Sequence, residues 1–181
     1  MLTANAPSAP PHGLSAILST FGDPRPFIGR DASIAPTWET QHITRARLPR
    51  PMRFAHTEVS RIPCHVGLTR HFRDVLQDVE DAGFWDDVEF GGSYSVRPMH
   101  GGGALSTHAW GIAIDLIPVG PTMPAQIVEL FAHYGFTWGG PPDPAHFQFA
   151  TGYGLGIGHR PVHRVAWVPP ALPSDPNFIA A

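Results

Sequence analysis

Residues 106–117 read Ser-Thr-His-Ala-Trp-Gly-Ile-Ala-Ile-Asp-Leu-Ile, and this stretch gives the clearest indication of the fold. From Ile112 to Ile117 the residues are mostly apolar and rich in isoleucine, which predicts a buried strand that follows a turn at Gly111. Asp115 interrupts that run. Because burying a carboxylate is costly unless a cation or a metal ion pairs with it, Asp115 is the first candidate for a functional residue.

Helical periodicity appears on both sides of this strand. Apolar residues at helical spacing predict helices over residues 13–22, 68–82 and 124–134, with Thr122 as a candidate cap for the last. Further strands are expected near residues 88–96 and 146–150. Residues 23–53 contain five prolines and are expected to form loops with at most short strands. The order of elements predicts an α+β fold with a small, largely antiparallel sheet flanked by helices.

The chain has 181 residues, which suits one domain with a hydrophobic core. We expect a mobile lead-in over residues 1–12, the domain over 13–150, and a Gly- and Pro-rich arm over 151–181. The first residues lack the basic and apolar regions of a secretory signal, so synthesis in the cytoplasm is expected. No stretch is apolar enough for membrane insertion, and the protein is expected to be a monomer.

Charge gives a further restriction on partners. Twelve basic residues against fifteen acidic ones give a net charge of −3, which argues against nucleic acid as the main partner. Arg45, Arg47, Arg50 and Arg53 nevertheless form a local basic patch. This patch is either a docking site for an anionic polymer such as cell wall or a solvated face, and runs of charge are usually solvated faces.

Two histidines complete a possible metal site with Asp115. A hydrolytic zinc site needs three protein ligands and one open position for water, and His108, Asp115 and His146 offer two imidazoles and a carboxylate. With eleven histidines in the chain, any single one is more often structural than a ligand. The alternative interpretation pairs Asp115 with an arginine in a buried salt bridge.

Other residues fit the remaining steps of hydrolysis. Asp143 precedes His146 by three residues across a Pro-containing turn, so its carboxylate can move a proton from water to a leaving amine. Arg97 is expected to stabilise the oxyanion. The glycines at 101–103 permit close approach of an extended peptide. The candidates for substrate contacts are Ser106, Tyr94, Trp138 and Gly102.

These motifs resemble the zinc peptidases of the D-Ala-D-Ala carboxypeptidase family, called M15 or VanY-like. The family also includes phage endolysins that cleave the L-alanyl-D-glutamate bond. Its pattern Ser-x-His-x-x-Gly-x-Ala-x-Asp is matched from Ser106 to Asp115, followed by Trp-Gly-Gly at residues 138–140 and an acid three residues before a second His, at Asp143 and His146. The likeness is strongest over residues 88–150, and the subgroup that it resembles is phage endolysin-like. The family's fold, shared with the Hedgehog signalling domain, agrees with the α+β prediction.

The resemblance implies Zn²⁺ on His108, Asp115 and His146, with Asp143 as the catalytic base and Arg97 as a transition-state partner. It implies a peptidoglycan stem peptide as substrate, cut by an L-Ala-D-Glu endopeptidase or, as the alternative, trimmed by a D-Ala-D-Ala carboxypeptidase. A non-catalytic zinc-bearing module, structural or wall-binding, is the alternative from another class. Without a signal peptide, action on the cell wall is expected to follow phage-type release.

Overall fold

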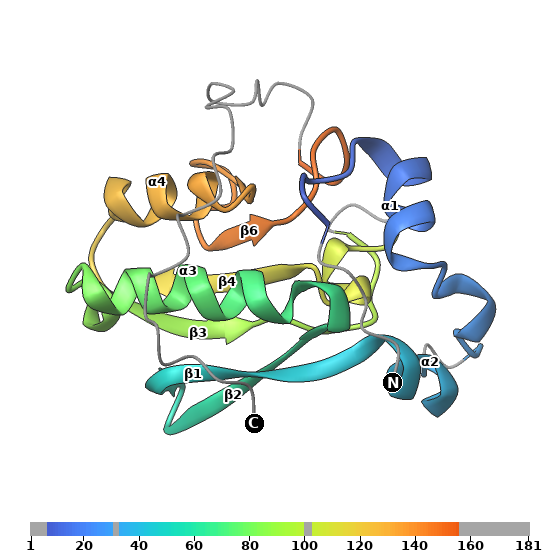
Figure 1. Ribbon diagram of the computed structural model, residues 1–181, viewed down its shortest axis with the longest axis horizontal. Helices are drawn as coiled ribbons and strands as arrows, with labels where there is room; N and C mark the ends of the chain where they lie inside the picture. Colours follow the sequence, from blue (N-terminus) through green and yellow to red (C-terminus); the bar gives the residue numbers. More distant parts are fainter. Residues whose placement is uncertain (1–6, 31–32, 100–102, 156–181) are drawn as a thin grey trace, which may run out of the picture.

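The structure, a computed structural model, describes residues 7–30, 33–99 and 103–155 of the chain (Figure 1). Half of the predicted lead-in and most of the predicted C-terminal arm therefore lie outside the described residues, and so does Gly102. In the part that is described, residues before α1 contact the chain just after the last strand, since the Thr151 N–H donates to the Pro11 carbonyl at 2.9 Å. The described part of the lead-in is therefore hydrogen-bonded to the domain.

A four-stranded antiparallel sheet contains the apolar strand around Asp115. Its strands are β3 (Val88–Gly92), β4 (Ala113–Pro118), β5 (Thr137–Trp138) and β6 (His146–Gln148), in the order β3-β4-β6-β5. The predicted strands are confirmed in type and place, whereas the two-residue strand β5 was not expected. Because β4 lies inside the sheet with β3 and β6 on its two sides, its backbone is paired along both edges. Ile112, Ile114 and Leu116 are fully buried as predicted, whereas Ile117, near the end of the strand, is 48% exposed.

A long hairpin begins in the last third of residues 23–53, where loops with at most short strands were predicted. Strand β1 (Ile43–Phe54) pairs with β2 (Thr57–His65) in a separate two-stranded antiparallel sheet. The prediction was wrong because two prolines, Pro49 and Pro51, were taken to break the strand. Both lie within a shift of register between Arg47 and Met52, and a bulge in an edge strand tolerates residues that cannot donate to the ladder.

The three predicted helices are present. They are α1 (Gly13–Phe21), α3 (Thr69–Asp81) and α4 (Ala125–His133), and the structure adds a short α2 (Pro36–His42) with Pro36 in its first turn. Single-turn 3₁₀ helices complete the fold: η1 (Arg25–Phe27), η2 (Val66–Leu68), η3 (Trp85–Asp87) and η4 (Thr107–Trp110). Thr122 does not cap α4, because Pro124 occupies the N-cap position and no side chain caps the helix.

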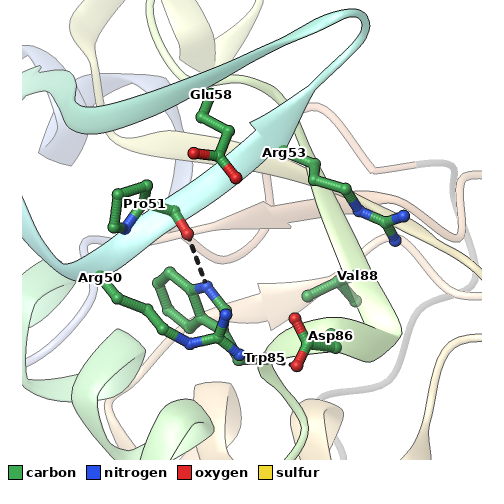
Figure 2. A pocket seen from close by; sticks show the side chains of 7 residues that line it. All are labelled: Arg50, Pro51, Arg53, Glu58, Trp85, Asp86 and Val88. Carbon is green, nitrogen blue, oxygen red and sulfur yellow. Dashed lines mark hydrogen bonds and ion pairs between the residues drawn. The ribbon is translucent and has the colours of Figure 1, made fainter.

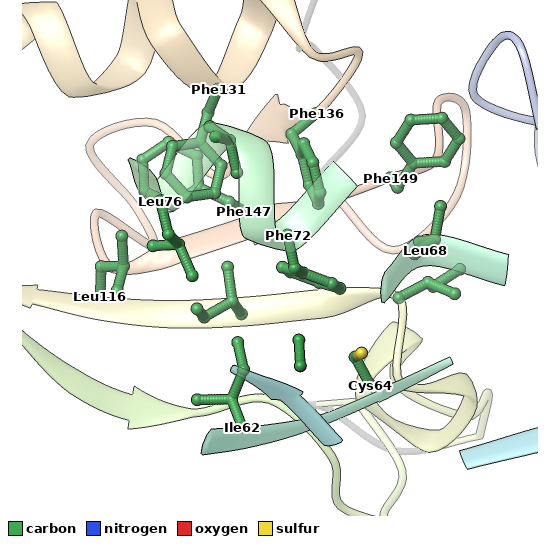
Figure 3. Packing of buried hydrophobic residues seen from close by; sticks show 14 of the residues in the cluster. Ile62, Cys64, Leu68, Phe72, Leu76, Leu116, Phe131, Phe136, Phe147 and Phe149 are labelled. Carbon is green, nitrogen blue, oxygen red and sulfur yellow. The ribbon is translucent and has the colours of Figure 1, made fainter. Parts of the chain in front are cut away.

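Helix α3 supplies the centre of the core. Its apolar stripe is fully buried and consists of Phe72, Val75, Leu76 and Val79. In Figure 3, the side chains of α3 lie between the hairpin on one side and a group of phenylalanines from α4, β6 and their connections on the other. The helix thus joins the two sheets, and the amphipathic pattern that predicted it is the contact that holds them together. None of the described helices is long and apolar enough to cross a membrane.

The buried histidine His65 is expected to make the stability of the protein depend on pH. His65 is 5% exposed; its Nε2–H donates to the Phe21 carbonyl at 3.2 Å, and its Nδ1 accepts from the Gly67 N–H at 3.1 Å. Burial, with a smaller contribution from His42, lowers the pKa of His65 to about 4 from the ordinary 6.5. Between these values the unfolded chain binds a proton that the folded chain excludes, so stability is lost as pH falls through this window.

We expect His65 to account for a loss of about 3 kcal/mol in the free energy of unfolding between pH 7 and pH 4. Urea unfolding of the wild type and of His65→Gln across that range measures this contribution as the difference between the two pH profiles. Glutamine keeps an acceptor for the Gly67 N–H and does not titrate. Parallel profiles for the two proteins would contradict the assignment.

Candidate metal centre

A tight turn fixes His108 at the start of the site. Ser106 is the N-cap of η4, and its Oγ accepts from the His108 N–H at 3.4 Å. Gly111 ends η4 with φ of 67°, and a Cβ there would lie 2.8 Å from the His65 backbone nitrogen, so both the conformation and the space require glycine. The His108 side chain is 2% exposed. The turn therefore holds a buried imidazole in one place.

The register of the sheet brings the other two predicted ligands together. Asp115 of β4 lies directly opposite His146 of β6 in their antiparallel pairing. Side chains of directly opposed residues point to the same face, a few ångströms apart. The Asp115 side chain is 26% exposed, whereas the His146 side chain is 9% exposed. The carboxylate is thus the part of the cluster that is open to solvent.

Three ligand atoms converge in this cluster. The Asp115 Oδ1 lies 3.1 Å from His108 Nε2 and 3.0 Å from His146 Nδ1, and the two ring nitrogens are 3.2 Å apart. Tetrahedral ligands at metal–ligand distances of about 2.0–2.1 Å are about 3.3–3.4 Å from one another. The observed triangle differs from this by a few tenths of an ångström. The spacing and the two-imidazole, one-carboxylate donor set therefore fit a zinc ion.

The outer hydrogen bonds of the two rings determine which ring nitrogens face the centre of the cluster. The His108 Nδ1–H donates to the Ser93 carbonyl at 3.2 Å, and the His146 Nε2–H donates to the Gln148 Oε1 at 3.1 Å. In these neutral tautomers, His108 Nε2 and His146 Nδ1 both present lone pairs to the Asp115 carboxylate. Three acceptors and no donor meet at one point, which a metal ion satisfies.

Electrostatics at the cluster agree with this arrangement. Without a metal ion, a proton on an inner ring nitrogen takes the place of the cation. Burial alone would raise the pKa of Asp115, but hydrogen bonds from the protonated His108 and His146 rings outweigh it and hold that pKa well below its usual range. Burial would lower the pKa of His146, but the hydrogen bond that its protonated ring donates to Asp115 outweighs it and raises that pKa, with Asp143 also contributing. The cluster thus carries a negative field that favours a positive charge among the three side chains. The alternative pairing of Asp115 with an arginine is not found among the described residues.

Asp143 lies in the short loop between β5 and β6. The Trp138 Nε1–H donates to the Pro144 carbonyl at 2.8 Å across this loop, and the Gly139 N–H donates to the His146 carbonyl at 2.7 Å. A Cβ at Gly139 would lie 2.9 Å from the Cβ of Asp143, so glycine is needed for the loop to fold so closely. Asp143 itself is exposed, and its carboxylate is near enough to raise the pKa of His146. This position suits a group that exchanges protons with solvent.

Arg97 is tied to the His108 turn through its backbone. The Ser106 N–H donates to the Arg97 carbonyl at 3.0 Å, so Arg97 lies beside the residue that caps η4. Its side chain is partly buried, and its guanidinium forms no ion pair with any residue in the described part of the chain. The role of Arg97 as a partner of the oxyanion stays a prediction.

The predicted substrate contacts lie in different surroundings. Ser106 is buried, and its hydroxyl is used in the cap of η4. Tyr94 is partly buried. Burial raises the pKa of its phenol, and the carboxylate of Glu39 in α2 raises it further, so the hydroxyl lies close to α2. Trp138 closes the Asp143 loop, as described above. These roles in substrate binding stay predictions.

Part of the basic patch has a structural role. The Arg50 guanidinium forms ion pairs with Glu80 at 2.8 Å and with Asp86 at 2.7 Å. Arg53 pairs with Glu89 at 3.2 Å. These bonds attach the far end of the hairpin to α3, η3 and β3. The interpretation of the patch as a solvated face with ordinary ion pairs therefore suits Arg50 and Arg53.

A surface pocket next to these ion pairs is separate from the metal cluster. Figure 2 shows Arg50 beside Trp85. The guanidinium carbon of Arg50 lies 5.7 Å from the centre of the Trp85 ring, and the Trp85 Nε1–H donates to the Pro51 carbonyl at 3.1 Å. None of the three metal-site residues lines the pocket. Arg45 and Arg47, farther along β1, are exposed and form no ion pair with any residue that the structure describes. Docking to an anionic polymer stays a hypothesis for those two arginines.

Sequence reasoning missed the residues that orient the rings. Ser93 acts through its carbonyl, which no side-chain pattern reveals. Thr107 and Gln148 are both buried, and the Thr107 hydroxyl donates to the Gln148 Oε1 at 3.0 Å. One signal was available for Gln148: in a strand, a residue two positions after a ligand points to the same face as that ligand.

The segment that holds this cluster also matches a known family. Residues 100–149 match the family model described as D-alanyl-D-alanine carboxypeptidase, which belongs to the M15 peptidases. The matched segment, a little over a quarter of the chain, contains all three ligand candidates and Asp143. The match confirms the resemblance to the M15 family and supports a peptidase; the phage endolysin-like subgroup stays a prediction. No match was found among curated proteins or among solved structures.

Proposed function

We propose that this chain, whose metal-site segment matches an M15 peptidase family model, is a zinc-dependent hydrolase of an amide bond in peptidoglycan stem peptides. One observation carries the proposal. The Asp115 carboxylate and two imidazole nitrogens meet within 3.2 Å of one another, with the other nitrogen of each ring held by a buried acceptor. A merely structural cluster would not need three lone pairs at one point.

Zinc bound by His108, Asp115 and His146 would supply Lewis-acid chemistry, polarising the scissile carbonyl and making water a nucleophile near neutral pH. As water attacks the carbonyl carbon, the Asp143 carboxylate takes up its proton and later delivers that proton to the leaving nitrogen. Arg97 donates to the oxyanion that develops on the attacked carbonyl. The partial exposure of Asp115 leaves the cluster open to solvent, and the Asp143 carboxylate is near enough to act on His146 electrostatically.

The bond that we propose is L-Ala-D-Glu, on the strength of the motif likeness to phage endolysins. Removal of the terminal D-Ala is the second candidate, and the printed description of the matching family favours it. A non-catalytic zinc-bearing module is disfavoured because Asp143 and Arg97 are retained, whereas a binding module needs neither. We propose a monomer that acts on the cell wall after release from the cytoplasm.

Digestion of purified muropeptides, with and without a zinc chelator, tests the proposal. Mass spectrometry of the products is expected to show a released stem peptide that lacks L-Ala, and no product when the chelator is present. Loss of a single alanine would assign the carboxypeptidase instead. Intact muropeptides after incubation with zinc-loaded protein would contradict both enzymatic candidates and leave the binding module.

A further inference from the structure

We propose that Gln148 is a positioning residue: its side-chain amide determines which ring nitrogen of His146 faces the metal. The inference rests on the proposed zinc site, and it concerns a residue that does not touch the metal. Gln148 is 1% exposed and lies two positions after His146 in β6, so both side chains point to the same face of the strand.

The orientation of the Gln148 amide is set by the backbone beyond β6. Its Nε2 donates to the Tyr153 carbonyl at 2.6 Å and lies 3.4 Å from the Ala150 carbonyl, both of which can only accept. A flipped amide would place an oxygen against those carbonyls and leave buried acceptors unsatisfied. The Oε1 must therefore point the other way, toward His146.

The position of this oxygen decides the tautomer of His146. Because Gln148 Oε1 lies 3.1 Å from His146 Nε2 and cannot donate, the ring proton must lie on Nε2. The lone pair is then on Nδ1, the atom that faces Asp115 at 3.0 Å and His108 at 3.2 Å. An acceptor behind the ring also makes the ligating nitrogen more basic, as outer partners of metal-bound histidines do.

The same amide links the two segments that carry the histidine ligands. Thr107, which precedes His108 in η4, donates its hydroxyl to Gln148 Oε1 at 3.0 Å. The Tyr153 hydroxyl donates to the Leu105 carbonyl at 2.8 Å, just before η4. The turn after β6 is therefore bonded to the turn that holds His108, and Gln148 lies between them.

The two histidines are oriented in opposite ways. His108 has its proton on Nδ1, held by the Ser93 carbonyl, and presents Nε2 to the site, whereas His146 presents Nδ1. This difference gives a spectroscopic signature that depends on the outer acceptors and not on enzyme activity.

Two variants of Gln148 isolate the acceptor. Gln148→Met and Gln148→Glu both remove the amide that donates to Tyr153, but only the glutamate keeps an oxygen that can accept from His146. We expect Gln148→Met to weaken zinc binding by about 10- to 100-fold, measured by competition with a chromophoric chelator, and Gln148→Glu not to weaken it. Thr69→Val, which removes a partly buried hydroxyl that donates to the Val66 carbonyl outside the site, is the control and should leave zinc affinity unchanged.

Long-range ¹H–¹⁵N spectra of the zinc-loaded full chain supply the second readout. We expect His146 in the Nε2–H form with Nδ1 on the metal, and His108 in the Nδ1–H form with Nε2 on the metal. Zinc on His146 Nε2, or equal weakening in Gln148→Met and Gln148→Glu, would overturn the inference while leaving the zinc site in place. A wild-type chain that binds no zinc would overturn the proposed function as well.

Discussion

Replacing Asp143 with asparagine is expected to lower kcat by about 10²- to 10⁴-fold while the protein keeps its zinc. The amide of the new side chain would have nearly the same shape as the native carboxylate but could not accept the proton of the attacking water. Asp143 is exposed in its loop and is not one of the three converging ligands, so the metal site should survive the change. Steady-state hydrolysis of a stem peptide, together with metal analysis of the same sample, measures both effects.

Two variants serve as controls for this result. Asp87→Asn makes the same substitution at an exposed acidic residue of η3 and should leave kcat unchanged. Asp143→Glu keeps a carboxylate, so it should retain much more activity than Asp143→Asn. If Asp143→Asn turned over at the wild-type rate, another group would have to move the proton.

Replacing His108 with alanine is expected to remove both zinc and turnover. His108 is buried and supplies one of three converging atoms, so its loss leaves two ligands and a small cavity. We expect zinc affinity to fall by more than about 100-fold, because losing even an outer partner of a ligand costs about 10- to 100-fold. Chelator competition and peptide hydrolysis measure the two losses.

The control for this variant is His133→Ala, at an exposed histidine of α4, which should bind zinc and hydrolyse peptide like the wild type. Thermal unfolding of both metal-free variants distinguishes loss of the ligand from loss of the fold. Full zinc occupancy in a folded His108→Ala protein would remove His108 from the ligand set.

Patterns within short stretches of sequence predicted the helices and strands whose spacing of buried residues is regular. The stripe of α3, with Phe72 and Leu76 in it, was visible because a helix buries one face at a fixed spacing. The hairpin was not predicted, because Pro49 and Pro51 break a strand in most contexts. Only the pairing with β2 shows that they fall where the register shifts.

The candidate site was also predicted in part: the sequence indicated its ligand residues but not their orientation. Asp115 stood out because it is a carboxylate in an apolar strand, and the ligand set of a hydrolytic zinc site pointed to both histidines, which the family pattern also matches. The orientation of the histidine rings was not predictable, since it depends on a carbonyl of Ser93 and an amide of Gln148, each placed by contacts between distant segments. Ligand types follow from residue identity, whereas their geometry follows from the packed backbone.

Anomalous diffraction at the zinc edge from crystals of the zinc-loaded protein tests the central claim most directly. We predict a single strong peak between His108 Nε2, Asp115 Oδ1 and His146 Nδ1, with a fourth position open to solvent. A peak elsewhere in the chain, or none in protein prepared with excess zinc, would contradict the account.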